Sequence, residues 1–193
     1  MISRPFLPRS TKVTKQDQNS GNIQRRLQAL LAYPREDLDI ELKGWLDLSS
    51  ECDKSILAQA ILALANSGGG YVLLGFAEEG GGWIPAEQYP SHLNGYTQDI
   101  VNGIVQRYAD PPFHCEVYHA LHPQSGLLFP IVTVPGGHKV PIRAKRDGPN
   151  REHIRQNTYY IRGLGPTSEP PQFGQEYDEL IGIDELVMNP RAL

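Results

Sequence analysis

Apolar residues recur at two different spacings along the 193-residue chain, and the spacing predicts the type of each element. Helical spacing predicts helices over residues 22–33, within 49–70, over 96–108 and over 173–183. Alternating or continuous apolar runs predict strands over residues 38–46, 71–76, 114–122, 127–134 and 158–164. This order of helices and strands predicts an α/β (α+β) domain in which helices pack on a mixed β-sheet.

The predicted strand at 38–46 has a charged face. A period of two separates its apolar from its charged residues: Leu38, Ile40 and Leu42 against Asp39, Glu41 and Lys43. One interpretation is a half-buried strand whose charged face meets water. The other is a divalent-metal site for phosphodiester hydrolysis, in which Glu36 and Glu41 bind Mg²⁺ or Mn²⁺ and Lys43 offsets developing charge. The pattern alone leaves both open.

A second acidic pair, Glu78 and Glu79, follows the apolar run 71–76 directly. If that run is the sheet neighbour of 38–46, its end can bring a third carboxylate to the same site, because neighbouring strands lie about 4.8 Å apart. The alternative is an ordinary polar turn.

The glycine-rich stretch 66–71, "NSGGGY", is not a phosphate-binding loop by its pattern. It lacks the lysine and hydroxyl of a P-loop, and it follows a helix where a P-loop precedes one. We expect a structural role, with positive φ at the helix end and close backbone approach, and no nucleotide cofactor.

Cysteine and histidine positions do not predict a zinc site. Cys52 and Cys115 are too few for a four-cysteine site and are expected to be reduced thiols. On a strand, Cys115 and His119 would stand roughly 13 Å apart, too far to share one ion. We therefore expect no zinc.

Charge is segregated along the chain although the net charge is only −4. Residues 1–21 are predicted to be a flexible basic arm, and 22–193 the folded domain. The segment 139–162 holds seven basic residues against two acids: Lys139, Arg143, Lys145, Arg146, Arg151, Arg155 and Arg162. Such a block is either a solvated face or a surface for an anionic partner.

The run 158–164 ends that basic block and alternates in character. Tyr160 and Arg162 share one predicted face, which offers an aromatic ring for base stacking and a guanidinium for phosphate. Core packing of the tyrosine is the alternative.

No apolar run reaches the roughly 18 residues of a membrane helix, and the N-terminus lacks the apolar core of a signal peptide. We therefore expect a cytoplasmic protein with no membrane partner.

The chain resembles the Schlafen AlbA-type (AlbA_2) domain family in three segments at similar spacing: "EDLDIELKGWLDL", "LAQAILALANSGGGYVLLGFAEE" and "TYYIRGLGPTSEP". The resemblance runs from about Ile23 to Ile181, and the helix leading into the glycines and the next strand is its most specific part. It implies a single Schlafen AlbA-like lobe, a nucleic-acid-binding α/β module.

Site residues are also implied by the resemblance. Some Schlafen proteins cut transfer or ribosomal RNA through three metal-binding acids. Glu36, Glu41 and Lys43 match the family spacing, Glu78 is the first choice for the third acid with Glu79 as the alternative, and the family arginine falls on Arg162.

The chain departs from the family pattern in places. Leu42 replaces the usual aromatic residue, and glutamate stands where aspartate is common at the third acid. The cysteine and histidine zinc set of animal Schlafens is absent.

The resemblance predicts a nucleic-acid-binding protein that acts as a metal-dependent endoribonuclease on structured RNA such as tRNA. The alternative is a non-catalytic RNA- or DNA-binding module that serves as a regulator or subunit of a larger complex. Animal Schlafens join two lobes into a horseshoe, so we expect a homodimer or a partner subunit that supplies a second lobe. The residues expected to bind nucleic acid are Lys139, Arg143, Lys145, Arg146, Arg155, Tyr160 and Arg162.

Overall fold

The computed structural model describes residues 15–182 except 92, 164 and 166. Its helices are α1 (Lys15–Ala32), α2 (Glu51–Asn66), α3 (Gln98–Tyr108), α4 (Gly174–Ile181) and the 3₁₀ turn η1 (Pro149–Arg151). Its larger strands are β1 (Ile40–Lys43), β2 (Gly69–Leu74), β3 (Phe76–Glu79), β4 (Gly82–Pro85), β6 (Glu116–Leu121) and β7 (Leu128–Pro135). Its two-residue strands are β5 (Ala109–Asp110), β8 (Arg143–Ala144), β9 (Ile161–Arg162) and β10 (Ser168–Glu169).

A four-stranded sheet in the order β1-β2-β7-β6 lies at the centre of the fold. β1 and β2 are parallel, whereas β2 with β7 and β7 with β6 are antiparallel, which confirms the predicted mixed sheet. The parallel pair needs a crossover, and α2 supplies it. β2 is a central strand of this sheet, as its continuous apolar run predicted.

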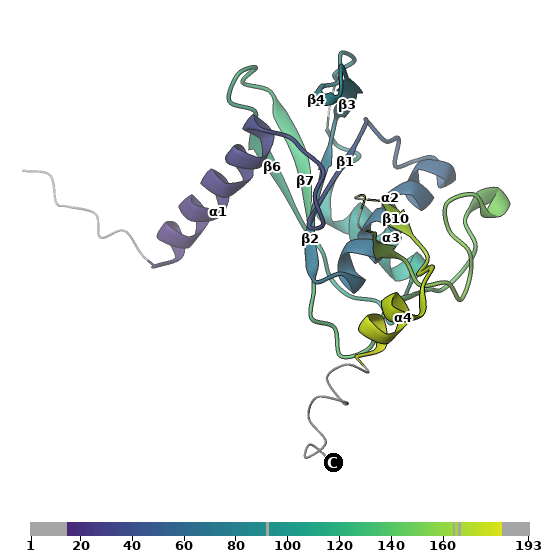
Figure 1. Cartoon of the computed structure of the whole chain (residues 1–193). Helices are drawn as coiled ribbons and strands as arrows, with labels where there is room; N and C mark the ends of the chain where they lie inside the picture. Colours follow the sequence, from purple (N-terminus) through teal and green to yellow (C-terminus); the bar gives the residue numbers. More distant parts are fainter. Residues whose placement is uncertain (1–14, 92, 164, 166, 183–193) are drawn as a thin grey trace, which may run out of the picture.

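Helices cover both faces of this sheet (Figure 1), so the domain has three layers. Alternate residues of β2 point to opposite faces of the sheet and pack in different cores. Leu73 faces a core shared with α1, and Val72 and Leu74 face the larger core with α2 and α3. In β1, Leu42 belongs to the α1 side, so its neighbour Glu41 must point to the α2 side. The position of Glu41 thus follows from strand alternation.

Several boundaries differ from the predictions. The run predicted as one strand over 71–76 is divided at Gly75 between β2 and β3, and of the strand predicted over 158–164 only the two residues of β9 are described as a strand, outside the central sheet. α1 begins at Lys15, so residues 15–21 of the predicted arm are helical, and residues 1–14 lie outside the described part. The strand predicted over 38–46 is reduced to the four residues of β1, because Asp37 and Ile40 exchange backbone hydrogen bonds of 3.0 and 3.2 Å in a tight turn. Leu38 sits in this turn and is 50% exposed.

The glycines after α2 have the structural role that the sequence predicted. Gly68, Gly69 and Gly70 have φ of 95°, 90° and 152°. A Cβ on Gly70 would lie 2.2 Å from the carbonyl oxygen of Asp39, and one on Gly69 would lie 2.6 Å from the Gly136 nitrogen. These positions let the backbone of the turn approach its neighbours closely.

A buried histidine predicts loss of stability in mild acid. Burial lowers the pKa of His122, whose Nδ1 accepts a hydrogen bond of 3.2 Å from the Ser125 amide. The unfolded state therefore takes up a proton first, and stability falls as the pH drops below 6.5. We expect the urea midpoint to fall between about pH 7.5 and 5.5, a range above the titration of ordinary carboxylates.

The matched variants for this prediction are His122→Asn and, on the exposed surface, His114→Asn. The pH dependence should be weaker in the first and unchanged in the second. His119 has a pKa lowered by burial as well, so part of the acid effect should persist in His122→Asn. An identical fall in all three proteins would contradict the assignment.

In the described part of the chain, no helix is both long and apolar enough to cross a membrane.

Candidate functional site

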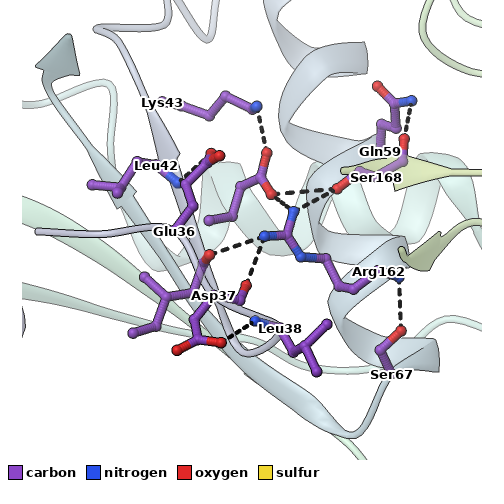
Figure 2. Close-up of polar contacts among 11 residues, drawn as sticks. Glu36, Asp37, Leu38, Leu42, Lys43, Gln59, Ser67, Arg162 and Ser168 are labelled. Atoms are coloured by element: carbon purple, nitrogen blue, oxygen red, sulfur yellow. Dashed lines mark hydrogen bonds and ion pairs between the residues drawn. The ribbon is translucent and has the colours of Figure 1, made fainter. Parts of the chain in front are cut away.

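A buried carboxylate lies at the centre of the candidate site, between Lys43 and Arg162, which are labelled in Figure 2. It belongs to Glu41 in β1, which is only 2% exposed, so the interpretation of a charged face open to water is wrong for this residue. Its Oε2 pairs with Arg162 Nη1 and its Oε1 with Lys43 Nζ. The Ser168 hydroxyl donates to Oε2 at 3.4 Å. Each carboxylate oxygen therefore already has a cationic partner.

Arg162 in β9 joins two distant parts of the chain through one guanidinium. Its side chain is fully buried, and Nη2 donates to the carbonyl oxygens of Asp37 at 2.8 Å and Ile40 at 3.0 Å. Burial lowers the pKa of Arg162, while the carboxylates of Glu36 and Asp37 oppose that shift. A phosphate cannot reach a fully buried guanidinium whose Nη1 and Nη2 already donate within the core, so the prediction that Arg162 holds phosphate is wrong.

Glu36 and Lys43 form the more open side of the site. Burial lowers the pKa of the Lys43 ammonium, and the Glu36 carboxylate opposes that shift. The Leu42 amide points at Glu36 Oε1 at 3.5 Å. With Glu41 and Arg162, these side chains form a group of two acids and two bases whose charges balance.

Three polar residues of the α2 segment position the strand that carries Arg162, and the sequence reasoning missed them. Asn66 Nδ2 donates to the carbonyl oxygens of Ile142 and Tyr160 at 2.8 and 2.9 Å. The Ser67 hydroxyl accepts from the Arg162 amide at 2.9 Å, and Gln59 Nε2 donates to the Ser168 carbonyl at 2.8 Å. A glutamine and an asparagine seven residues apart, in the otherwise apolar run 56–66 of α2, were the available signal.

Glu78 and Glu79 do not join the site. Both are exposed on the β3–β4 hairpin, where they pair with Trp83 and Gly82. Gly75, with φ of 95°, ends β2, and the chain then pairs with β4 instead of extending β2. Among the described residues, no three acids of the predicted set have ligand atoms within 4.8 Å of one another.

Tyr160 is 3% exposed and belongs to the core on the α2 side. Its hydroxyl accepts a hydrogen bond of 2.9 Å from the Arg155 amide. The predicted stacking of Tyr160 on bases is therefore wrong, because no base can reach the ring. Core packing was the correct alternative.

The other predicted phosphate-binding residues are exposed. Arg143 in β8 is bonded to Asp110 at 2.8 Å, and the next exposed cations follow it along the chain: Lys145, Arg146, Arg151 and Arg155. This segment is the green loop beside α2 in Figure 1. Lys139 lies apart from it, in the wall of a hollow of about 720 Å³ between the ends of α2 and α4. We call residues 143–155 the basic surface.

The residues present do not fit a preformed Mg²⁺ or Mn²⁺ site of three carboxylates. Glu41 directs its oxygens to Arg162 and Lys43, and a divalent cation bound there would be repelled by both. Glu36 is the more accessible acid, but one accessible carboxylate is a weak divalent-cation site. The metal-binding roles of Glu36 and Glu41 stay predictions.

The family model described as Schlafen, AlbA_2 matches residues 36–169. No curated protein matches the chain.

Solved structures that are similar to the chain include the following two. One is the DIP2311 protein from Corynebacterium diphtheriae, at 14% identity and a TM-score of 0.51, with 83% of this chain and 33% of that chain covered. The chain thus spans a third of that protein, and the likeness shows the fold alone. The other is the N-terminal domain of a Nitrosomonas europaea protein named as related to the ATP-dependent DNA helicase RecG, at 21% identity and a TM-score of 0.41, covering 69% of this chain and 86% of that chain.

Proposed function

The chain belongs to the Schlafen AlbA_2 family, and from this premise we propose that it binds nucleic acid along the basic surface. Structured RNA is the preferred ligand and DNA the alternative. The protein would act as a binding module, alone or as a subunit of a larger complex.

The exposure of the cations in residues 143–155 carries this proposal. Five lysine and arginine side chains face solvent there. Arg143 and Arg151 are paired with Asp110 and Asp147, which are themselves partly exposed. Exposed ion pairs contribute little and exchange easily, so these arginines remain available to phosphates. Along the rest of the chain acidic residues outnumber basic ones, because the net charge of the whole chain is −4. A polyanion would therefore be attracted to this face in particular.

Glu36 and Glu41 have a different role. The positive charges of Lys43 and Arg162 already balance the negative charges of Glu36 and Glu41, so this group of side chains attracts neither phosphate nor a cation strongly. Arg162 instead ties the end of the domain to β1, which holds the segment between β8 and β9 in place.

A second candidate function is metal-dependent endoribonuclease activity. Glu36, Glu41 and Lys43 do converge at one place, which favours it, and Mg²⁺ or Mn²⁺ would be the cofactor. Lys43 would stabilise negative charge on the phosphate, and Glu36 would be a ligand of the metal ion.

A second lobe would complete the proposed binding groove. Because the family horseshoe unites two lobes, a second copy of this chain or a partner subunit would supply the other one. Light scattering should find a dimer, alone or with RNA. A monomer under both conditions would count against the second copy.

Nucleic-acid binding is tested with two variants of equal charge change. Lys145→Ala/Arg146→Ala removes two cations from the basic surface, and Arg25→Ala/Arg35→Ala removes two exposed cations elsewhere. We expect the first to weaken binding of tRNA by at least about tenfold, because each lost phosphate contact lowers affinity, and the second to have a small effect. Fluorescence anisotropy with tRNA, single-stranded RNA and duplex DNA measures both. Equal losses in the two variants would contradict the assignment of the surface.

Cleavage is tested in the wild-type protein first. Labelled tRNA is incubated with Mg²⁺, with Mn²⁺ and with EDTA, beside Glu36→Gln. Fragments that require metal and disappear in Glu36→Gln would establish the nuclease. Intact tRNA in all lanes, with binding retained, would leave the binding module alone.

A further inference from the structure

A thiol, an imidazole and a carboxylate meet at a place remote from β1. The Cys52 sulfur, a ring nitrogen of His153 and a carboxylate oxygen of Glu152 all lie within 4.8 Å of one another. Cys52 lies in the first turn of α2, and the other two follow η1, about a hundred residues later in the chain. The fold thus brings together three metal-ligand types that the sequence keeps far apart.

The loop that carries Glu152 and His153 is held firmly at its base. Ile154, next to His153, is fully buried, and its carbonyl oxygen accepts from the Gly148 amide at 2.9 Å. Asp147 Oδ1 accepts from the Gln156 amide at 2.8 Å. A Cβ on Gly148 would lie 2.9 Å from Ser55 Cβ, so the loop is in close contact with α2. The three ligands therefore stand on anchored backbone.

The backbone between these anchors is strained. Asn150 and Arg151 have φ of 53° and 58°, in the left-handed region that non-glycine residues seldom adopt. Strained backbone of this kind persists where the surroundings enforce it, and it gathers at ligand sites and switches. Here two such residues in succession directly precede Glu152 and His153.

We propose that Cys52, Glu152 and His153 bind one Zn²⁺ ion and leave a fourth position open. Ligand atoms on one tetrahedral zinc ion are separated by roughly 3.3–3.8 Å, so atoms within 4.8 Å need only a small adjustment. Thiolate and imidazole favour zinc over Mg²⁺ or Ca²⁺. Three protein ligands and an open site are the arrangement of zinc ions that accept water or an anionic oxygen.

This site departs from the expectation of no zinc, and the reason is physical. That expectation rested on the small number of cysteines, Cys52 and Cys115, and on the spacing of Cys115 and His119 along one strand. Neither argument considers ligands that are distant in sequence. Cys115 is fully buried, whereas Cys52 is partly exposed and meets its co-ligands only through the packing of the loop on α2. The ion would fasten the loop that carries Arg151 and Arg155 to α2. The zinc proposal does not depend on the proposed function.

Metal content and spectroscopy test the site directly. The protein is dialysed against zinc with a weak chelator, and the bound metal is counted. Co²⁺ is then used in place of zinc, because a thiolate ligand gives cobalt a charge-transfer band. We expect one ion per chain and a thiolate band, both retained in His114→Asn. In Cys52→Ser the affinity for zinc should fall by at least about 100-fold, because a direct ligand matters more than the outer groups that support it.

Alkylation of the wild-type protein gives a second readout that needs no variant. Burial raises the pKa of Cys115 to about 12, and its side chain is inaccessible, so N-ethylmaleimide reports on Cys52. Zinc should slow this labelling strongly. Less than about 0.2 ions per chain, no thiolate band, or unchanged labelling with zinc would each overturn the proposal.

Discussion

Arg162→Met is expected to lower the free energy of unfolding by about 3–5 kcal/mol, the usual cost of removing one partner from a buried ion pair. The side chains of Arg162 and Glu41 are 0% and 3% exposed, so water cannot replace the lost guanidinium. The carbonyl oxygens of Asp37 and Ile40 lose a donor as well. Urea unfolding followed by circular dichroism measures the change.

Arg143→Met is the matched control for this prediction. Arg143 also bonds an acid at 2.8 Å, but its side chain is 48% exposed, so about 0–1 kcal/mol should be lost. A second variant, Arg162→Met/Glu41→Met, should recover part of the loss, because it removes both charges of the fully buried pair, while Lys43, which loses Glu41, is 30% exposed and still faces the Glu36 carboxylate. If Arg162→Met is as stable as Arg143→Met, the buried network does not hold the domain together.

Gly70→Ala is expected to have an effect of similar size, about 3 kcal/mol or more, by combining backbone strain with overlap of atoms. Its φ is 152°, and the new Cβ would stand 2.2 Å from the Asp39 carbonyl oxygen. That oxygen accepts from the Tyr71 amide at 2.8 Å, at the start of the β1–β2 pairing. The substitution should therefore push β1 away and weaken the Glu41 network with it. Thermal unfolding is the measurement.

Gly68→Ala separates the two causes in the same turn. Gly68 has φ of 95° and open space around it, so only strain applies and the loss should be about 1 kcal/mol. Equal losses in Gly68→Ala and Gly70→Ala would show that close approach to Asp39 does not matter.

Local patterns were enough to predict the mixed character of the central sheet and its four helices, but not the β3–β4 hairpin. The continuous apolar run of β2 predicted a central strand, and the glycines at its start predicted close backbone approach; both are observed. The start of α1 was missed because residues 15–21 are polar and carry no apolar period.

Side-chain partners across long separations could not be predicted in the same way. Arg162 was assigned to phosphate because exposed and buried arginines look alike in sequence, and its partner Glu41 is 121 positions earlier. Glu78 was assigned to the site because the turn at Gly75 does not show in a strand-like run. The meeting of Cys52 with His153 depends likewise on how a loop packs, so no spacing rule contains it.

The salt dependence of tRNA binding tests the central claim most directly. The logarithm of the binding constant is measured against the logarithm of salt concentration, for the wild-type protein and for Lys145→Ala/Arg146→Ala. If these residues neutralise phosphates, the wild-type slope is steep, and the variant slope is shallower by about one to two units. Equal slopes in the two proteins, or no binding of tRNA by the wild-type protein at low salt, would contradict the account.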